Sequence, residues 1–264
     1  PFRLNKLEII MVYLSMLIAL EDDRVFREAL DLCGTQLGVE FFSFRYSKEE
    51  MKSLRARLRS LSGHPMSFHG PMHTAELSEK KDSRQLQESF EAYRRALSLA
   101  QEVGAKYMVV HTHECFVRPD EKQERMKRSE ENIWNLAQLA RTYGIRLAIE
   151  NVSLPNKGVP LYNEEEYIAL IHRLPMCAAL IDLGHVHCTG WCLEHLCEAL
   201  RGRIAGFHLH NNNGMEDQHN WIHEGTMDIR RMMKIIRSSG EEPDLILEYG
   251  DTHGKNTSDL LDDL

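Results

Sequence analysis

The segment at 208–219, HLHNNNGMEDQH, gathers three histidines, three asparagines, one glutamate and one aspartate around a single glycine. It directly follows the segment RIAGF at 203–207, which is typical of a buried strand. Imidazoles and carboxylates together are ligands for zinc, manganese or iron(II), and they also act as general acids and bases. This composition indicates metal-dependent chemistry at the end of a strand.

Carboxylates and imidazoles also end other apolar runs of the chain. Glu150, Asp182 and Glu248 each end such a run, although Asp and Glu are almost never buried without a partner. A single histidine at a strand end is more often a hydrogen-bonded wall residue, but repeated acids have no packing rationale. Because crowded carboxylates repel one another, we expect divalent cations to hold them together. The predicted metal ligands are Glu150, Asp182, His208, Glu248, His69, His111, His185, Asp217 and His219.

Alternating strands and helices would position these side chains. Short β-branched or aromatic runs predict strands at 9–14, 39–44, 66–69, 107–111, 146–150, 178–182, 204–208 and 244–248. Amphipathic stretches predict helices at 23–37, 49–61, 84–103, 121–143, 164–174, 193–201 and 229–238, with a short last helix at 256–264. Glycines after several helical runs suit left-handed C-caps.

This alternation predicts the fold class. Eight strand–helix units in about 250 residues are typical of a closed (β/α)8 TIM barrel with parallel strands. We therefore predict a single barrel domain over residues 1–264. A doubly wound open sheet is the less favoured alternative, because the sequence has no Gly-rich phosphate turn after its first strand. The active site of a (β/α)8 barrel lies at the carboxyl ends of its strands, so all nine ligands would meet there.

Composition limits the partners and the compartment. The net charge of −8 makes nucleic acid an unlikely partner, and the basic run at 122–128, KQERMKR, is interpreted as a solvated helix face. The apolar stretch at 7–20 is too short to cross a bilayer, so no membrane association is expected. Six scattered cysteines and the lack of a signal peptide favour the cytoplasm. Cys188, Cys192 and Cys197 are interpreted as buried thiols around one helix.

The ordered strand ends resemble the xylose isomerase-like superfamily of metal-dependent barrels, which includes sugar isomerases, ketose epimerases, inosose dehydratases and endonuclease IV. The resemblance extends over nearly the whole chain, and the ordered set of motifs is far more specific than any one of them. The matching segments are FHGP at 68–71, VVH at 109–111, AIEN at 148–151, IDLGH at 181–185, FHLH at 207–210, DQH at 217–219 with EGT at 224–226, and LILE at 245–248.

The resemblance implies a role for each matching residue. A quartet formed by Glu150, Asp182, His208 and Glu248 would hold a divalent metal ion, and the two glutamates would act on the substrate as acid and base. His185 would contact a substrate oxygen. The implied reaction is an isomerisation or epimerisation of a small sugar, sugar phosphate or polyol, by proton transfer through a metal-stabilised enediolate. Family members commonly form dimers or tetramers, so a homodimer or homotetramer is expected.

Two alternatives remain open. In endonuclease IV nine ligands bind three zinc ions, and all nine have a counterpart here. Two or three ions in total, with cleavage of a phosphoester, are therefore an alternative to one ion on the quartet. A barrel that binds a ligand without catalysis is a third possibility. The ketose 3-epimerase subgroup carries an arginine where this chain has Gly214 and a glutamate where it has Asn156, which argues against that particular activity.

Further residues are candidates for substrate contact. The loop at 154–160, LPNKGVP, is the predicted lid, because its glycine and prolines punctuate a long connection. Trp221 is a candidate stacking surface for a sugar ring, with burial against the barrel as an equal alternative. His113 is a candidate substrate contact. Rim positions are the preferred interpretation for this group of histidines, which comprises His113, His187, His210 and His223.

Overall fold

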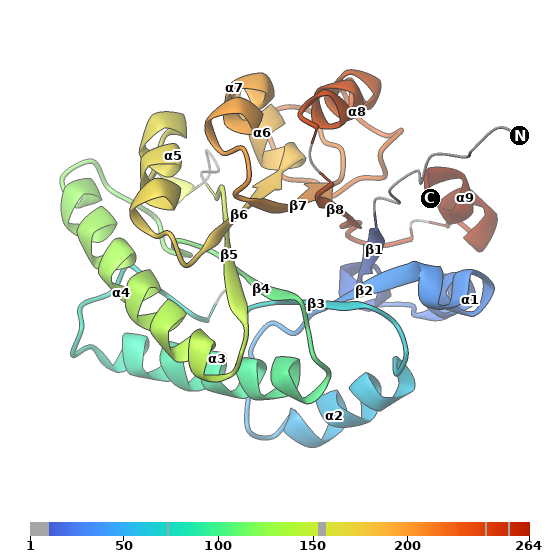
Figure 1. Ribbon diagram of the computed structural model, residues 1–264, viewed down its shortest axis with the longest axis horizontal. Helices are drawn as coiled ribbons and strands as arrows, with labels where there is room; N and C mark the ends of the chain where they lie inside the picture. Colours follow the sequence, from blue (N-terminus) through green and yellow to red (C-terminus); the bar gives the residue numbers. More distant parts are fainter. Residues whose placement is uncertain (1–10, 73, 153–156, 241, 253) are drawn as a thin grey trace, which may run out of the picture.

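The computed structural model describes residues 11–72, 74–152, 157–240, 242–252 and 254–264. Its eight strands pair in chain order, each parallel to the next, and β1 also pairs with β8, so the sheet closes into a barrel. Helices surround the strands (Figure 1), which confirms the predicted (β/α)8 barrel. The strands are β1 (Val12–Ser15), β2 (Leu37–Phe41), β3 (Met66–His69), β4 (Tyr107–Val110), β5 (Arg146–Glu150), β6 (Ala178–Asp182), β7 (Ile204–Leu209) and β8 (Asp244–Leu247).

The predicted helices are all present, although some end earlier than expected. The region predicted as one helix at 23–37 is divided at Gly34, whose φ of 56° lies in the left-handed region that favours glycine. The chain then forms a short 3-10 turn and enters β2 at Leu37, not at the predicted residue 39. The helices are α1 (Arg24–Cys33), α2 (Met51–Ser60), α3 (Arg84–Glu102), α4 (Lys122–Thr142), α5 (Glu164–Arg173), α7 (Leu193–Ala199), α8 (Ile229–Ser238) and α9 (Thr257–Asp263).

One helix is not among the predicted elements. Helix α6 (Leu183–Thr189) begins directly after β6, and the side chain of Asp182 caps it by accepting a hydrogen bond from the backbone N–H of His185 at 2.7 Å. With only seven residues, the helix is too short to produce a clear amphipathic period. The predicted first strand at 9–14 is observed from Val12 onwards, and its residues 9 and 10 lie outside the described residues.

Buried apolar side chains form two clusters. The larger one lies between the strands and the surrounding helices, and the smaller one, which includes Tyr13 and Leu180, fills the interior of the barrel. Because side chains alternate between the two faces of a strand, the residue two positions after an interior residue faces the interior as well. These successive interior residues are Val109 and His111, Ala148 and Glu150, Leu180 and Asp182, and Ile246 and Glu248. Strand periodicity thus places the predicted ligands on the inner face.

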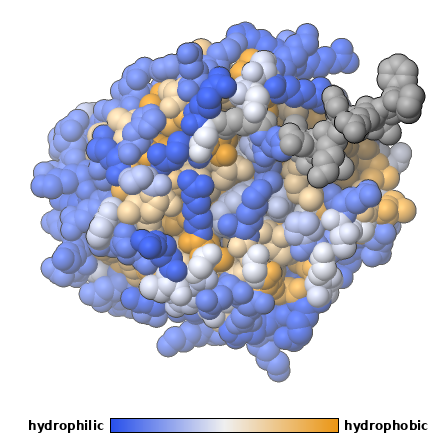
Figure 2. Space-filling model, in the orientation of Figure 1, coloured by the Kyte–Doolittle hydropathy of each residue, from blue (hydrophilic) through white to orange (hydrophobic). Residues whose placement is uncertain are grey.

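The charged residues at the start of α4 form the predicted i,i+4 pairs, but their face is only partly solvated, because Lys122, Arg125 and Arg128 are half-buried. Arg125 pairs with Glu121 at 3.3 Å and Arg128 with Glu124 at 3.6 Å, and both pairs have i,i+4 spacing. Hydrophilic residues cover most of the periphery of the face shown in Figure 2, and apolar residues lie nearer its centre. Within the part of the chain that the structure describes, none of the helices combines the length and apolar character needed to span a bilayer.

The three clustered cysteines differ from the expectation of buried thiols around one helix. Cys197 is buried in α7, but Cys188 is half-buried in α6 and Cys192 is exposed in the connection between the two helices. The unpredicted helix α6 explains the difference, because it places Cys188 and Cys197 on separate helices. All six cysteines have free thiols.

Candidate metal centre

The nine predicted ligands meet at the carboxyl ends of the strands. A cavity of about 390 Å³ opens there. Asp182 and His208 are fully buried and are not among the residues that line this cavity, although both contact residues that do. Apolar side chains, among them Phe44 and Met72, complete the cavity wall. The predicted ligands that line the cavity are His69, His111, Glu150, His185, Asp217, His219 and Glu248.

Three carboxylates surround one nitrogen of His208. Its Nδ1 atom lies 3.1 Å from Oε2 of Glu248, 3.6 Å from Oδ2 of Asp182 and 3.9 Å from Oε1 of Glu150. Glu150, Asp182 and His208 each offer a ligand atom within 4.8 Å of one another. The four side chains come from β5, β6, β7 and the residue after β8. This geometry brings the predicted quartet together.

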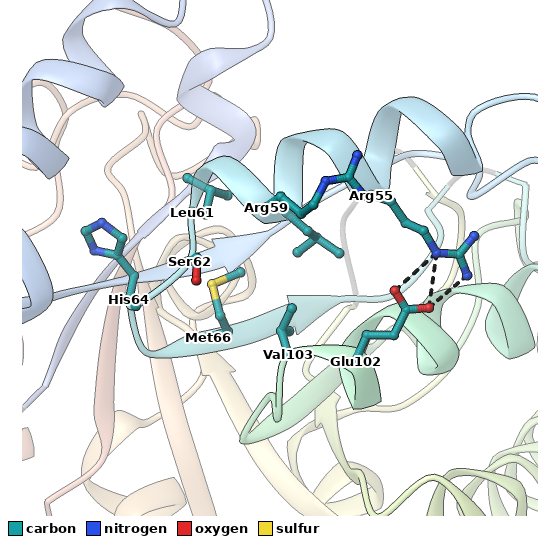
Figure 3. A pocket seen from close by; sticks show the side chains of 10 residues that line it. Arg55, Arg59, Leu61, Ser62, His64, Met66, Glu102 and Val103 are labelled. Atoms are coloured by element: carbon teal, nitrogen blue, oxygen red, sulfur yellow. Dashed lines mark hydrogen bonds and ion pairs between the residues drawn. The ribbon is translucent and has the colours of Figure 1, made fainter.

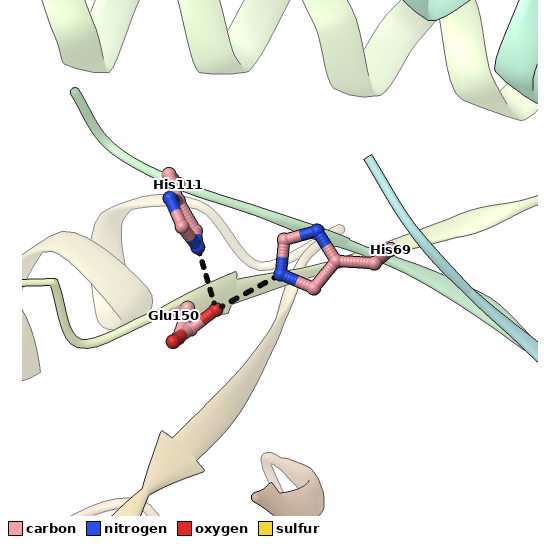
Figure 4. A group of neighbouring side chains, drawn as sticks. All are labelled: His69, His111 and Glu150. Carbon is pink, nitrogen blue, oxygen red and sulfur yellow. Dashed lines mark ion pairs between the residues drawn. The ribbon is translucent and has the colours of Figure 1, made fainter. Parts of the chain in front are cut away.

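A second group of ligand atoms lies on the other side of Glu150. Figure 4 shows the rings of His69 and His111 directed at the same oxygen, Oε2 of Glu150, at 3.5 and 3.0 Å. The other oxygen of Glu150 lies 3.2 Å from Nδ1 of His185. The carboxylate of Glu150 therefore lies between the quartet and the histidine pair, so the two groups share it.

The loop after β7 supplies the remaining ligands. Oδ2 of Asp217 lies 3.3 Å from Nε2 of His185 and 3.1 Å from Nε2 of His219. Asn211 orders this loop: its side chain donates to the carbonyl of Ile222 and accepts from the backbone N–H of Met227. The polar segment of the sequence is therefore a folded loop directly beyond a buried strand, and it carries the candidate ligands Asp217 and His219.

In three of the histidine rings, the nitrogen that points away from the cluster of carboxylates has a hydrogen-bond partner of its own. Nδ1 of His69 donates to the carbonyl of Gly70 at 2.9 Å, and Nδ1 of His219 donates to the carbonyl of Glu248 at 3.0 Å. Nδ1 of His111 lies 2.6 Å from Oε1 of Glu114. In each case the ring presents its other nitrogen to the carboxylates, which is the orientation that metal-binding histidines adopt.

The electrostatics of the cluster reflect strong coupling between acids and imidazoles. Burial lowers the pKa of His111, but the carboxylates of Glu150 and Glu114 outweigh it and raise the pKa to about 9. Burial is likewise outweighed at His219, where Asp217 raises the pKa to about 10. Burial alone would raise the pKa of Glu150, yet the neighbouring histidines hold it well below its usual value. The carboxylates therefore require nearby positive charge.

The chemistry of the donor set fits a divalent metal ion. Several buried atoms of the candidate ligands have no hydrogen-bond partner among the described residues. Imidazole nitrogens mixed with carboxylate oxygens, without a thiolate, suit zinc, manganese or iron(II). These atoms are His69 Nε2, Glu150 Oε2, His185 Nδ1, His208 Nδ1 and Asp217 Oδ1.

His113 and Trp221 lie outside the cavity wall. His113 is buried, with Nδ1 3.0 Å from the hydroxyl of Thr112, and burial lowers its pKa to about 4. Trp221 is also buried: its ring stacks on Tyr249 with centroids 4.6 Å apart, and its indole N–H donates to the carbonyl of Asp251. Neither side chain lines the cavity in the described part of the chain.

Of the histidines assigned to the rim, His210 has a different position. It is fully buried, and its Nε2 lies 3.1 Å from both oxygens of Asp182. Gly184 makes room for it, because a Cβ at that position would come within 2.0 Å of the His210 ring. The rim interpretation is therefore wrong for His210 and for the buried His113, whereas His187 is half-buried and His223 is exposed.

Three residues near the centre were not predicted from the sequence. Glu40 lies in the barrel interior beside His208, and Glu114 accepts hydrogen bonds from His111 and from Nζ of Lys157. Glu76 accepts from the backbone N–H groups of residues 114 and 115 and so holds the loop that carries Glu114. Only Glu40 had a recognisable signal, as a lone acid inside the apolar run LGVEFF.

The predicted lid is described only in part. Its residues 154–156, which include Asn156, lie outside the described residues. At the described end of the loop, the backbone N–H of Val117 donates to the carbonyl of Lys157 at 2.8 Å, and the N–H of Val159 donates to the carbonyl of Val117 at 3.0 Å. This pairing fixes Lys157 in the cavity wall.

A larger hollow, of about 690 Å³, lies at the opposite end of the barrel. Figure 3 shows it between the end of α2, the first residue of β3 and the end of α3. Its acidic residue, Glu102, is paired with Arg55 at 2.8 Å, and Nδ1 of its histidine, His64, donates to the carbonyl of Leu37. Size alone is therefore a poor guide to the functional site of this protein.

A closed parallel barrel with imidazoles and carboxylates gathered at its carboxyl-end mouth defines a class of (β/α)8 proteins with a candidate divalent-metal centre. The model of the family described as xylose isomerase-like TIM barrel matches residues 29–263. The chain belongs to this family, as its sequence motifs predicted.

Individual proteins of known name are similar to this chain. Inosose isomerase from Bacillus licheniformis is 21% identical over 169 residues, which cover 61% of this chain and 59% of that protein. A solved structure of IOLI protein with a binding zinc atom has a TM-score of 0.75 at 16% identity and covers 96% of this chain and 94% of its own. A D-tagatose 3-epimerase-like protein has a TM-score of 0.71 at 18% identity, with 96% of both chains covered. The chain spans 65% and 59% of the lengths of the first curated relatives it matches.

Proposed function

We propose that this protein is a divalent-metal-dependent isomerase or epimerase of a small sugar, sugar phosphate or polyol. The observation that carries the proposal is the placement of Glu150 and Glu248. Both line the cavity, and both lie beside Nδ1 of His208 at 3.9 and 3.1 Å. A molecule held at the quartet would thus lie next to two carboxylates that can exchange protons with it.

The quartet of Glu150, Asp182, His208 and Glu248 would hold the ion, which we infer to be zinc, manganese or iron(II). When bound, a divalent ion polarises a substrate carbonyl and acidifies the proton on the adjacent carbon. Six of the nine predicted ligands fall in two groups that share Glu150, and His185, Asp217 and His219 form a further group, which leaves room for more than one ion.

The side chains supply the proton transfers. Glu150 removes a carbon-bound proton, and Glu248 returns a proton on the other face or at the neighbouring carbon. His185, whose Nδ1 lies 3.2 Å from Glu150, is placed to donate a hydrogen bond to a substrate oxygen. The apolar wall formed by Leu17, Phe44 and Met72 excludes water from one side of the cavity and strengthens these interactions.

The named relatives support this proposal at the level of reaction class. The similar proteins include an inosose isomerase and a D-tagatose 3-epimerase-like protein, and another of similar fold has a binding zinc atom. The cavity, at about 390 Å³, is within the usual range for small-molecule sites. A monosaccharide or a cyclic polyol is therefore a suitable substrate class.

A substrate screen in deuterated water tests the proposal. Protein loaded with zinc, manganese or iron(II) is incubated with ketoses, polyols and their phosphates, and proton NMR follows product formation and deuterium incorporation. We expect one substrate class to exchange a carbon-bound proton, and Glu150→Gln to reduce that exchange by at least about 100-fold. Full activity of Glu150→Gln on an identified substrate would contradict the role assigned to Glu150.

Phosphoester cleavage by a multinuclear centre is the second candidate. The observation that favours it is that the structure brings all nine predicted ligands together, including His69, His111 and Asp217. Two or three ions about 3.5–4 Å apart would support hydrolysis. Two or more ions per chain together with turnover of a phosphoester, and no isomerisation, would replace the isomerase proposal with this one.

A further inference from the structure

A buried carboxylate lies behind the quartet. Glu40, in β2, has no solvent exposure and follows the interior position of Gly38 by two residues. Burying a charged carboxylate destabilises the fold unless a hydrogen-bond or ion-pair partner compensates the lost hydration. Ser67 donates a hydrogen bond to its Oε2 at 3.4 Å, which is a weak neutral contact. The sequence pattern of β2 gives no packing reason for an acid at this position.

The ion-pair partner of Glu40 among the described residues is His208. Nε2 of His208 lies 3.2 Å from Oε1 and 3.4 Å from Oε2 of Glu40. The opposite nitrogen, Nδ1, faces Glu248 and Asp182. Both residues are fully buried, so water does not compete for these contacts. The imidazole of His208 is thus held between one isolated carboxylate and the group of ligand carboxylates.

This geometry determines which nitrogen can bind a cation. A metal-binding nitrogen needs a free lone pair, so the ring proton must be on the other nitrogen. Oε2 of Glu40 accepts a hydrogen bond from the N–H at Nε2, at 3.4 Å, which leaves the lone pair of Nδ1 free. A carboxylate in this position also fixes the plane of the ring and increases the basicity of the ligand nitrogen.

We propose that Glu40 is a positioning residue that orients His208 and selects the tautomer whose Nδ1 binds the metal ion. This inference rests on the proposed metal centre. Glu40 acts through His208 and does not touch the cavity, because it is absent from the residues that line it. The assignment adds a tenth residue to the centre and explains a buried acid that the quartet alone leaves unexplained.

Asp244 provides a matched control. It is also a buried acid in a barrel strand, but Nζ of Lys106 binds its two oxygens at 2.8 and 2.9 Å. It lies at the opposite end of β8 from Glu248, and no ion pair among the described residues joins it to a predicted ligand, although its charge also acts on Glu40 through space. Asp244→Asn therefore removes a buried charge of the same kind without removing a contact to the metal centre.

The test measures zinc binding by isothermal titration of chelator-treated full-length protein, together with the melting temperature of the metal-free form. We expect Glu40→Gln to weaken zinc affinity about 10- to 100-fold, because the amide is neutral and can donate to Nε2, which favours the wrong tautomer. Asp244→Asn should lower the melting temperature and leave zinc affinity unchanged. Wild-type affinity in a folded Glu40→Gln variant would overturn the inference and leave the proposed function intact.

Nitrogen-15 NMR of His208 in the wild-type protein gives a second measurement that does not depend on the folding of a variant. We expect the proton on Nε2 in the zinc-loaded protein and a metal-shifted Nδ1 resonance. A protonated Nδ1 in the zinc-loaded protein would overturn the positioning role. If the wild-type protein binds no zinc, manganese or iron(II), the proposed function fails as well, so the two failures are distinguishable.

Discussion

Oε2 of Glu150 lies 3.0 Å from Nε2 of His111, while Oε1 of the same carboxylate faces the quartet. This one side chain therefore connects the histidine pair at the ends of β3 and β4 with the ligands from β6 and β7. A substitution of Glu150 should weaken metal binding at the quartet and at the histidine pair. A substitution of His69 or His111 should weaken it mainly at the histidine pair.

This connection predicts an effect on metal content. His69→Gln with His111→Gln should reduce the number of bound ions while the quartet retains one, because the quartet does not depend on these rings. Glu150→Gln should weaken binding at both groups. Elemental analysis after dialysis measures the ion number, and Glu165→Gln on the exposed face of α5 is the control carboxylate. Equal metal content in all variants would contradict the shared role of Glu150.

Removal of metal should produce a characteristic pH dependence. The folded-state pKa of His111 is raised to about 9 and that of His219 to about 10, above the unfolded value near 6.5. Their stabilisation is present in full below about pH 6.5 and is lost as the pH rises through about 9 and 10. The melting temperature of the chelated protein should therefore fall over this window. Circular dichroism measures it, and the His111→Gln, His219→Gln double variant should show a flatter profile.

Gly184 should be required for the position of His210. A Cβ at residue 184 would come within 2.0 Å of the His210 ring, so Gly184→Ala must displace that ring from Asp182. We expect a loss of about 1–3 kcal/mol in the free energy of unfolding and weaker metal binding. Gly250→Ala, whose Cβ would meet His219 at an ordinary 3.4 Å, is the control in urea denaturation. An equal response of the two variants would show that the crowding is relieved elsewhere.

Trp221 should contribute to stability more than to substrate binding. Its ring stacks on Tyr249 outside the cavity, and its indole N–H is bound to the carbonyl of Asp251. Trp221→Phe should lower the melting temperature and leave the KM for the identified substrate unchanged. Phe44→Ala, which removes part of the cavity wall, should raise that KM. A raised KM for Trp221→Phe would support the sugar-stacking role instead.

The barrel and the clustering of the candidate ligands could be predicted because both follow from periodicity. Strands that alternate with helices define the fold, and an acid such as Glu150 at the end of an apolar strand has no structural role without a cation. The position of His210 could not be predicted, because it depends on the helix α6 and on the space left by Gly184. Glu114 was missed for a related reason: it reaches His111 through a loop that Glu76 holds from a distant part of the sequence.

In our proposal these side chains form a divalent-metal centre, and the metal content of the purified protein reports on that centre without any knowledge of the substrate. Elemental analysis of the purified wild-type protein after dialysis should find at least one equivalent of zinc, manganese or iron per chain, and Asp182→Asn should lose most of it, since Asp182 is fully buried within the quartet. Wild-type protein that retains no more transition metal than Asp182→Asn, even after loading, would show that these residues do not form a metal centre.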